Sequence, residues 1–196
     1  MLDGTSARLR RSPFDDAGPA RAGELPDGPA VRVSIVPPEA RFKLRIREED
    51  LDRVPPLSGL RLAIPINSYV QDGARCTLRL GPNEWLLLAP ESEGERTARE
   101  VAGALGGTFH SLVDISHRHA ALAVAGPEAA SVLNAGCPLD LGARAFPTGR
   151  ATRTLLGKAE IILMRTGDGP DYRLELGRSF AGYVRAFLAE AARGAG

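Results

Sequence analysis

The chain has 196 residues, of which 25 are Lys or Arg, 24 are Asp or Glu, and 43% are hydrophobic. A chain of this length buries enough apolar surface to form a core without disulfides or a metal. The formal net charge of +1 does not favour nucleic acid as a partner. No apolar run approaches the roughly 20 residues of a membrane span, no secretion signal is recognisable, and two cysteines give no disulfide framework. We therefore expect a soluble, cytoplasmic protein that binds neither nucleic acid nor a membrane.

The first 30 residues differ in composition from the rest of the chain. They contain several prolines and glycines and few apolar side chains, so they cannot form a core of their own. Residues 1–30 are predicted to be an extended N-terminal arm, which either follows a partner surface or is a flexible tail. Residues 31–196 are predicted to form a single α+β domain.

Alternating apolar residues over 31–35 and 41–47 predict two half-buried strands. The second strand carries a row of cations on one face, which we expect to be solvated. Residues 48–74 are rich in proline and glycine and are predicted to form turns. The cations of this face are Arg41, Lys43, Arg45 and Arg47.

Regular elements follow from residue 76 onward. Ser92 and Glu95 have the spacing of a capping box at the start of a helix, and Pro127 suits the first turn of a second helix. Between residues 84 and 156 the order is strand, helix, strand, strand, helix, strand, which is that of ferredoxin-like split βαβ units. The further strands predict a larger α+β fold. The predicted strands are 76–80, 84–89, 108–115, 119–125, 151–156, 159–165 and 172–176.

The closing helix has the clearest periodicity in the chain. Its apolar residues recur at i, i+3, i+4 and i+7 between residues 180 and 191. We expect its aromatic residues, Phe180, Tyr183 and Phe187, to lie in the core.

The densest polar cluster is Asp114-Ile115-Ser116-His117-Arg118-His119. It holds the residue types of a hydrolytic triad, but side chains this close in sequence cannot converge as a triad requires. A zinc site would combine its histidines with His110 or Asp114, and no characteristic ligand spacing is present. The cluster is therefore predicted to be neither catalytic nor metal-binding, and to hydrogen-bond its own turn or contact a partner.

Other chemical motifs are also incomplete. The sequence around Gly157-Lys158 lacks the remaining residues of a phosphate-binding loop, and no dinucleotide-binding glycine motif follows a strand. Cys76 and Cys137 are expected to be inert structural thiols. The arginines of the C-terminal half suit carboxylate partners, either in ion pairs or on an acidic cofactor tail such as the glutamate of a folate.

Five blocks of sequence stand out when they are taken together. They are L-G-P-N-E-W-L-L-L at 80–88, V-D-I-S-H-R at 113–118, V-L-N-A-G-C-P-L-D-L at 132–141, T-R-T-L-L-G-K at 152–158 and R-S-F-A at 178–181. In this order they resemble the gamma subunit of heterotetrameric sarcosine oxidase, strongly over residues 75–190 and weakly over the first 70.

The resemblance implies a fold similar to the folate-binding domain of glycine-cleavage aminomethyltransferase. It implies alpha, beta and delta subunits as partners, with FAD, FMN and NAD associated with the two large chains and zinc with delta. Such complexes oxidatively demethylate sarcosine to glycine and reduce oxygen to hydrogen peroxide. The one-carbon unit becomes formaldehyde, or 5,10-methylenetetrahydrofolate when tetrahydrofolate is the co-substrate. This chain would then be an accessory, non-catalytic subunit that binds no cofactor itself.

Two other functions stay open at this point. A free-standing folate-binding or aminomethyltransferase-like protein would need a carboxylate for the pterin, for which Asp114 and Glu84 are candidates. A nucleic-acid binder would use the basic strand 41–47. No catalytic residue is predicted, and cofactor-binding residues are unknown. The residues selected for an interface or motif role are Asp114, His117, Arg118, Arg153 and Arg178.

Overall fold

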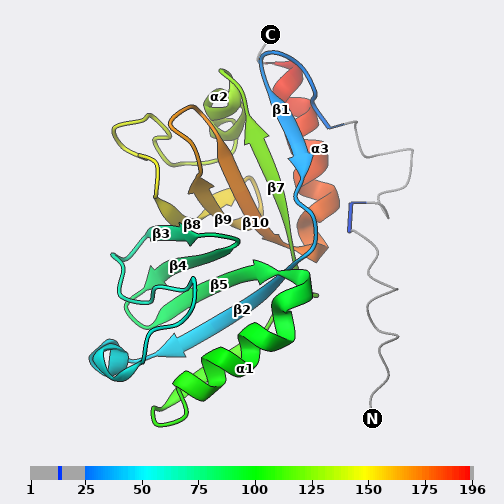
Figure 1. The fold of residues 1–196 in the computed structure, drawn as a ribbon. Coiled ribbons are helices and arrows are strands. Elements are labelled where there is room, and N and C mark those ends of the chain that lie inside the picture. Colours follow the sequence, from blue (N-terminus) through cyan, green and yellow to red (C-terminus); the bar gives the residue numbers. More distant parts are fainter. Residues whose placement is uncertain (1–12, 15–24, 195–196) are drawn as a thin grey trace.

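Two five-stranded antiparallel sheets make up the framework of the part of the chain that the structure describes (Figure 1). The structure is a computed structural model that describes residues 13–14 and 25–194. Sheet A has the strand order β1-β7-β10-β9-β8, and sheet B has the order β3-β4-β5-β2-β6. The chain therefore passes from sheet A to sheet B after β1 and returns to sheet A after β6.

The bounds of the elements are as follows. Sheet A contains β1 (Arg32–Ile35), β7 (His119–Ala125), β8 (Ala151–Leu156), β9 (Ala159–Arg165) and β10 (Tyr172–Gly177). Sheet B contains β2 (Glu39–Ile46), β3 (Ser68–Asp72), β4 (Arg75–Gly81), β5 (Glu84–Pro90) and β6 (His110–Asp114). The α-helices are α1 (Gly94–Ala104), α2 (Ala129–Asn134) and α3 (Ala181–Arg193), and the 3-10 helices are η2 (Glu48–Arg53), η3 (Glu91–Glu93) and η4 (Arg178–Phe180).

The predicted α+β class and the split βαβ order are confirmed. β5 and β6 both run antiparallel to β2, which lies between them, so β5-α1-β6 is one split unit. In sheet A, β7 and β9 both run antiparallel to β10. The second unit therefore joins β7 to β9 rather than to β8, and β8 adds a hairpin at the edge of the sheet.

Strand β3 lies inside the stretch that was predicted to be turns. It forms a hairpin with β4, in which Asp72 pairs with Arg75 across Gly73. Gly73 has a φ of +61°, a left-handed conformation that glycine adopts without strain. Tyr69 and Val70, followed by Asp72-Gly73, are the local strand and turn signals of this hairpin.

Three apolar clusters hold the layers together. The first lies between sheet A and the helices α2 and α3, the second between sheet B and α1, and the third between the two sheets. Phe14 is buried in the first cluster, and its carbonyl oxygen accepts a hydrogen bond of 2.9 Å from Arg185 Nη1. Most of the predicted arm lies outside the described residues, so its conformation stays a prediction.

Two expectations about helix ends and faces are wrong. The α1 helix begins at Gly94 without a side-chain cap, because the η3 turn precedes it and displaces Ser92 from the capping position. Phe180 of η4 and Tyr183 of α3 are 38% and 37% exposed rather than in the core. The Tyr183 hydroxyl instead accepts a hydrogen bond from the backbone N–H of Lys158.

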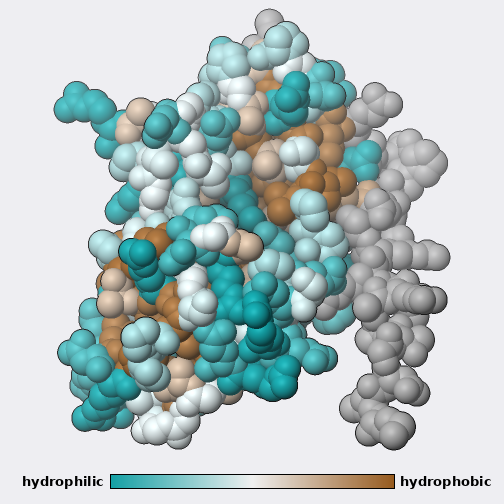
Figure 2. Space-filling model, in the orientation of Figure 1, coloured by the Kyte–Doolittle hydropathy of each residue, from teal (hydrophilic) through white to brown (hydrophobic). Residues whose placement is uncertain are grey.

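The surface is mixed in character. Figure 2 shows apolar residues gathered over β1 and β7, whereas hydrophilic residues cover the start of α1. Ile35, at the end of β1, is 40% exposed. Among the residues described, no helix combines the length and the apolar character that crossing a membrane needs.

Candidate functional site

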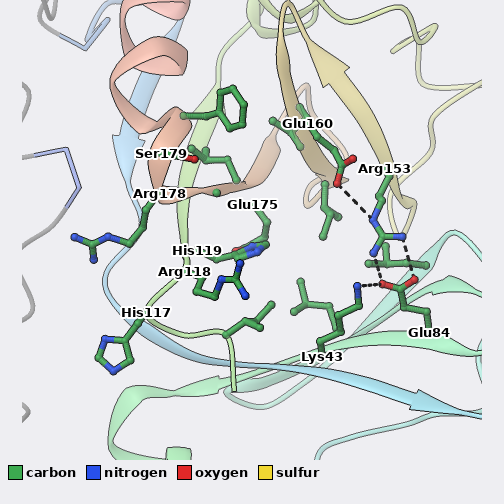
Figure 3. A pocket seen from close by; sticks show the side chains of 18 of the residues that line it. Lys43, Glu84, His117, Arg118, His119, Arg153, Glu160, Glu175, Arg178 and Ser179 are labelled. Atoms are coloured by element: carbon green, nitrogen blue, oxygen red, sulfur yellow. Dashed lines mark hydrogen bonds and ion pairs between the residues drawn. The ribbon is translucent and has the colours of Figure 1, made fainter. Parts of the chain in front are cut away.

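A cavity of about 580 Å³ opens between the two sheets. Strands β2, β4 and β5 line it from sheet B, and β8, β9 and β10 line it from sheet A. The β6–β7 turn and η4 close one end (Figure 3). Its walls combine apolar side chains with charged ones, which is typical of small-molecule sites and of subunit contacts alike. The apolar lining includes Leu86, Ile115, Ile162 and Leu176.

Four of the five residues selected from the sequence line this cavity, namely His117, Arg118, Arg153 and Arg178. The fold thus brings together a turn, strand β8 and helix η4, which are far apart in sequence. Figure 3 shows Arg118 and Arg153 pointing toward the cavity, whereas His117 and Arg178 point away from it. These two also line a neighbouring cavity of about 80 Å³ next to Phe14.

Glu84 is surrounded by three cations. Its carboxylate lies 2.9 Å from Lys43 Nζ, 3.0 Å from Arg45 Nη2 and 3.1 Å from Arg153 Nη1. Burial opposes its ionisation, but the hydrogen bonds from Arg153 and Lys43 prevail and lower its pKa to about 2. Glu84 therefore carries its charge and ties β5 to β8, so its carboxylate is already engaged within the chain.

A second charged network crosses between the sheets. Arg41 of β2 donates from Nε to Glu175 Oε2 of β10 at 2.7 Å, and both side chains are buried. Arg173 bonds the same carboxylate and also Glu39. Burial opposes ionisation of Glu175, but Arg41 and Arg173 offset it, so the pKa stays below its ordinary value. The prediction of a solvated basic face is therefore wrong for Arg41.

The β6–β7 turn is held by its own side chains. Asp114 Oδ1 accepts hydrogen bonds from the backbone N–H of Ser116 at 2.8 Å and from its hydroxyl at 2.5 Å. Ser116 Oγ in turn accepts from the backbone N–H of Arg41 at 2.9 Å. The Ser116 hydroxyl is thus hydrogen-bonded directly to the Asp114 carboxylate. In a catalytic triad a histidine would lie between these two groups, so this arrangement is that of a structural turn. Asp114 does not line the cavity.

The zinc alternative finds no geometric support in residues 13–14 and 25–194. This part of the chain contains no group of three His, Cys, Asp or Glu side chains that could hold a metal ion. Cys76 and Cys137 are both buried, as expected. Burial raises the pKa of the Cys76 thiol to about 12, and Glu39 and Glu175 act in the same direction against Arg173.

His119 and Lys43 also line the cavity, although neither is among the five residues selected from the sequence. His119 Nδ1 is buried and has no hydrogen-bond partner in the part of the chain that the structure describes. Burial lowers the pKa of the imidazole below its ordinary value, and the neighbouring cations Arg41, Arg118 and Lys43 act in the same direction against Glu175. The available sequence signal was the rarity of lysine, since Lys43 is one of two lysines in an arginine-rich chain.

Comparison with known sequences gives one consistent result. Residues 55–194 match the model of the sarcosine oxidase gamma subunit family. The sarcosine oxidase gamma subunit of an Arthrobacter species is 42% identical over 97 residues, covering 50% of this chain and 47% of the relative. The gamma subunit of Corynebacterium sp. strain U-96 is 32% identical over 172 residues, covering 86% of this chain and 82% of the relative. The first alignment thus spans about half the length of its relative.

Solved structures agree with this result. A chain of heterotetrameric sarcosine oxidase from Corynebacterium sp. U-96, in complex with pyrrole 2-carboxylate, superposes with a TM-score of 0.79 at 30% identity. The match covers 95% of this chain and 96% of that one. Glycine cleavage aminomethyltransferase T from Bartonella henselae has a TM-score of 0.62 at 15% identity, covering 84% and 46%, and shares the fold. The chain belongs to the sarcosine oxidase gamma subunit family.

Proposed function

We propose that this chain is the accessory, non-catalytic gamma subunit of a cytoplasmic heterotetrameric sarcosine oxidase. The observation that carries the proposal is the likeness to a chain of the Corynebacterium complex over nearly the full length of both chains. The complex would oxidatively demethylate sarcosine to glycine and reduce oxygen to hydrogen peroxide. The one-carbon unit would leave as formaldehyde or, with tetrahydrofolate, as 5,10-methylenetetrahydrofolate.

The partners in this proposal are the alpha, beta and delta subunits. FAD, FMN and NAD would be held by the two large chains and zinc by delta, so this chain would contribute structure rather than redox chemistry. The engagement of Glu84 by Lys43, Arg45 and Arg153 supports this assignment, because a carboxylate held in this way is not available to grip a pterin.

In this proposal, the partner subunits contact the surface around the β6–β7 turn. Asp114, His117 and Arg178 belong to it, whereas Arg118 and Arg153 shape the cavity behind it. Strand β6 is an edge of sheet B, so one side of its backbone is available for contact with another chain. Phe109 is 83% exposed just before this strand, and Val113 is 48% exposed within it. Exposed apolar side chains at a strand edge are typical of subunit interfaces.

The test is co-expression of this chain, carrying an affinity tag, with the alpha, beta and delta chains. We expect the purified material to contain all four chains, to show the visible absorbance of bound flavin, and to oxidise sarcosine. Recovery of a lone, colourless chain would contradict the proposal.

A charge placed on the proposed contact surface tests the interface itself. Val113→Lys is expected to reduce recovery of the partner chains at least about tenfold, because a buried unpaired charge costs several kcal/mol. Ile66→Lys is the matched control, because Ile66 is 41% exposed and lies outside this surface. Equal recovery from the two variants would exclude this face as the contact.

A further inference from the structure

We propose that the cavity between the two sheets binds a small organic carboxylate, held by Arg118, Lys43 and His119. This inference concerns the interior of the cavity and does not depend on the proposed subunit role. Three observations on the described residues carry it: a guanidinium that forms no ion pair with them, a buried ring nitrogen that forms no hydrogen bond with them, and an excess of cations around an apolar floor.

Arg118 presents its guanidinium to the cavity from a fixed backbone. Its N–H donates to the Ile115 carbonyl at 2.9 Å, and its carbonyl accepts from the Arg178 N–H at 2.9 Å. Within residues 13–14 and 25–194, no carboxylate forms an ion pair with it, and Figure 3 shows it pointing inward beside His119. A planar guanidinium donates two parallel hydrogen bonds to a carboxylate, so the geometry of Arg118 suits this ligand.

His119 supplies a polar atom that the protein itself leaves unsatisfied. Nδ1 is buried and makes no hydrogen bond to any described residue, which is unusual for a buried nitrogen. Burial lowers the pKa of this ring below its ordinary value and so favours the neutral imidazole; Arg41, Arg118 and Lys43 act in the same direction, and Glu175 opposes them. A neutral ring with its proton on Nδ1 donates one hydrogen bond to a carboxylate oxygen.

The charge around the cavity favours an anion. Lys43 Nζ lies 2.9 Å from Glu84, and an ammonium has further donors to offer. Glu175 is already paired with Arg41 and Arg173. The cations that face the cavity or belong to these ion pairs outnumber the carboxylates: they are Arg41, Lys43, Arg45, Arg118, Arg153 and Arg173, against Glu39, Glu84, Glu160 and Glu175.

The floor of the cavity selects a carboxylate that carries an apolar body. Leu86, Ile115, Ile162, Leu176 and Phe180 form much of the lining. A volume of about 580 Å³ lies within the range of small-molecule sites. An aromatic monocarboxylate has the anionic group and the apolar surface that these walls complement.

The experiment uses the full chain with benzoate as the probe and the imidazole proton resonances as the readout. The sequence has three histidines, and the variants His110→Gln and His117→Gln identify the remaining signals as those of His119. Benzoate is expected to shift the His119 resonances in a saturable manner and to raise the pKa of this ring, because a bound anion stabilises the imidazolium. Benzamide, which has the same shape without the charge, is expected to leave them in place.

Two variants locate the binding. Arg118→Gln is expected to weaken benzoate binding at least about tenfold, because a charge-assisted bidentate contact is lost. Arg99→Gln, which changes an exposed arginine on α1, is expected to bind as the unaltered chain does. The proposal is overturned if millimolar benzoate leaves His119 unmoved, if benzamide shifts it equally, or if Arg118→Gln binds normally. A shift with inorganic phosphate but not with benzoate would also overturn it, because the ligand would not be a carboxylate.

Discussion

The buried carboxylates of the described residues each lie against at least two cations. Asp50 is paired with Arg47 and Arg53, Glu84 with three cations, and Glu175 with two arginines. Burying a carboxylate without such partners would cost several kcal/mol. These pairs therefore explain how these three carboxylates can lie inside the molecule.

Replacing Glu84 by glutamine should destabilise the chain and flatten its response to acid. The pKa of Glu84 is about 2 when folded, below its ordinary value of 4.5. The ionised Glu84 carboxylate therefore stabilises the folded chain fully above pH 4.5, and this contribution is lost as the pH falls toward 2. We expect Glu84→Gln to lower the free energy of unfolding by about 2 kcal/mol at pH 7, with the difference disappearing near pH 2.

Urea unfolding at pH 7, 4 and 2 measures this difference. Glu160→Gln is the control, because its side chain is 74% exposed and 4.0 Å from Arg153, so it should change stability by less than about 0.5 kcal/mol. A Glu84 variant whose deficit stays constant from pH 7 to pH 2 would disprove the electrostatic explanation.

At the scale of elements, one glycine allows the turn before α2 to contact the segment before β1. Gly126 has a φ of +117°, and a Cβ there would lie 2.6 Å from the Ala30 carbonyl oxygen. That same oxygen accepts a hydrogen bond from the N–H of Glu128 at 2.9 Å. A side chain at position 126 would thus break the contact that joins these two segments.

Gly126→Ala should therefore lower the free energy of unfolding by about 2 kcal/mol or more, because it combines backbone strain with a clash. Gly103→Ala is the matched control, since Gly103 lies within α1 and a Cβ there meets no atom within 4 Å. This second variant should be stabilising by about 0.5 kcal/mol, because alanine favours the helix. Thermal unfolding compares the two, and similar changes in both would show that position 126 is not constrained.

The elements that were predicted well are those whose signal is local. Strands β7, β8 and β9 were predicted at their observed bounds, because strand-forming residues and the turn at Gly157-Lys158 mark them locally. Strand β3 was missed because its five residues, framed by prolines and glycines, have no buried face to mark them. The faces of α3 were assigned too broadly, since periodicity alone does not say how wide the contact with the sheet is.

The site depends on pairings that no local pattern contains. Arg41 and Glu175 are 134 positions apart, and Glu84 and Arg153 are 69 apart. A row of cations on a strand can face either solvent or a carboxylate on another strand. The burial of Arg41 could therefore be predicted only by knowing which residues the opposite sheet presents to it. The turn at Asp114 was predictable, because an aspartate and a serine two residues apart bond locally.

At the scale of the whole molecule, the two sheets share a core and a charged network. The inter-sheet cluster includes Leu78, Leu86, Ile162 and Met164, and the Arg41–Glu175 pair crosses beside it. Elements coupled in this way are expected to unfold together. The prediction that residues 31–196 form one domain can be tested on this basis.

Trp85 is the single tryptophan and lies in sheet B, so its fluorescence reports on that sheet, whereas far-UV circular dichroism reports on both. We expect the two urea transitions to coincide. Glu175→Gln should lower the free energy of unfolding by about 3 kcal/mol, because Arg41 and Arg173 lose the negative charge of their shared buried partner. Both urea midpoints should therefore move to lower urea concentration together. Separate transitions in the unaltered chain would instead indicate two domains.

The path of the chain between the sheets also governs the order in which the protein can fold during synthesis. All five strands of sheet B have been synthesised once Asp114 is made. Sheet A must wait for β10, which lies between β7 and β9 yet is the last strand along the chain. Until Tyr172–Gly177 emerges, β7 and β9 expose unpaired edges, the condition in which nascent chains aggregate or engage chaperones. A chain truncated before Tyr172 would therefore contain every strand of sheet B but lack the strand that joins β7 to β9 in sheet A.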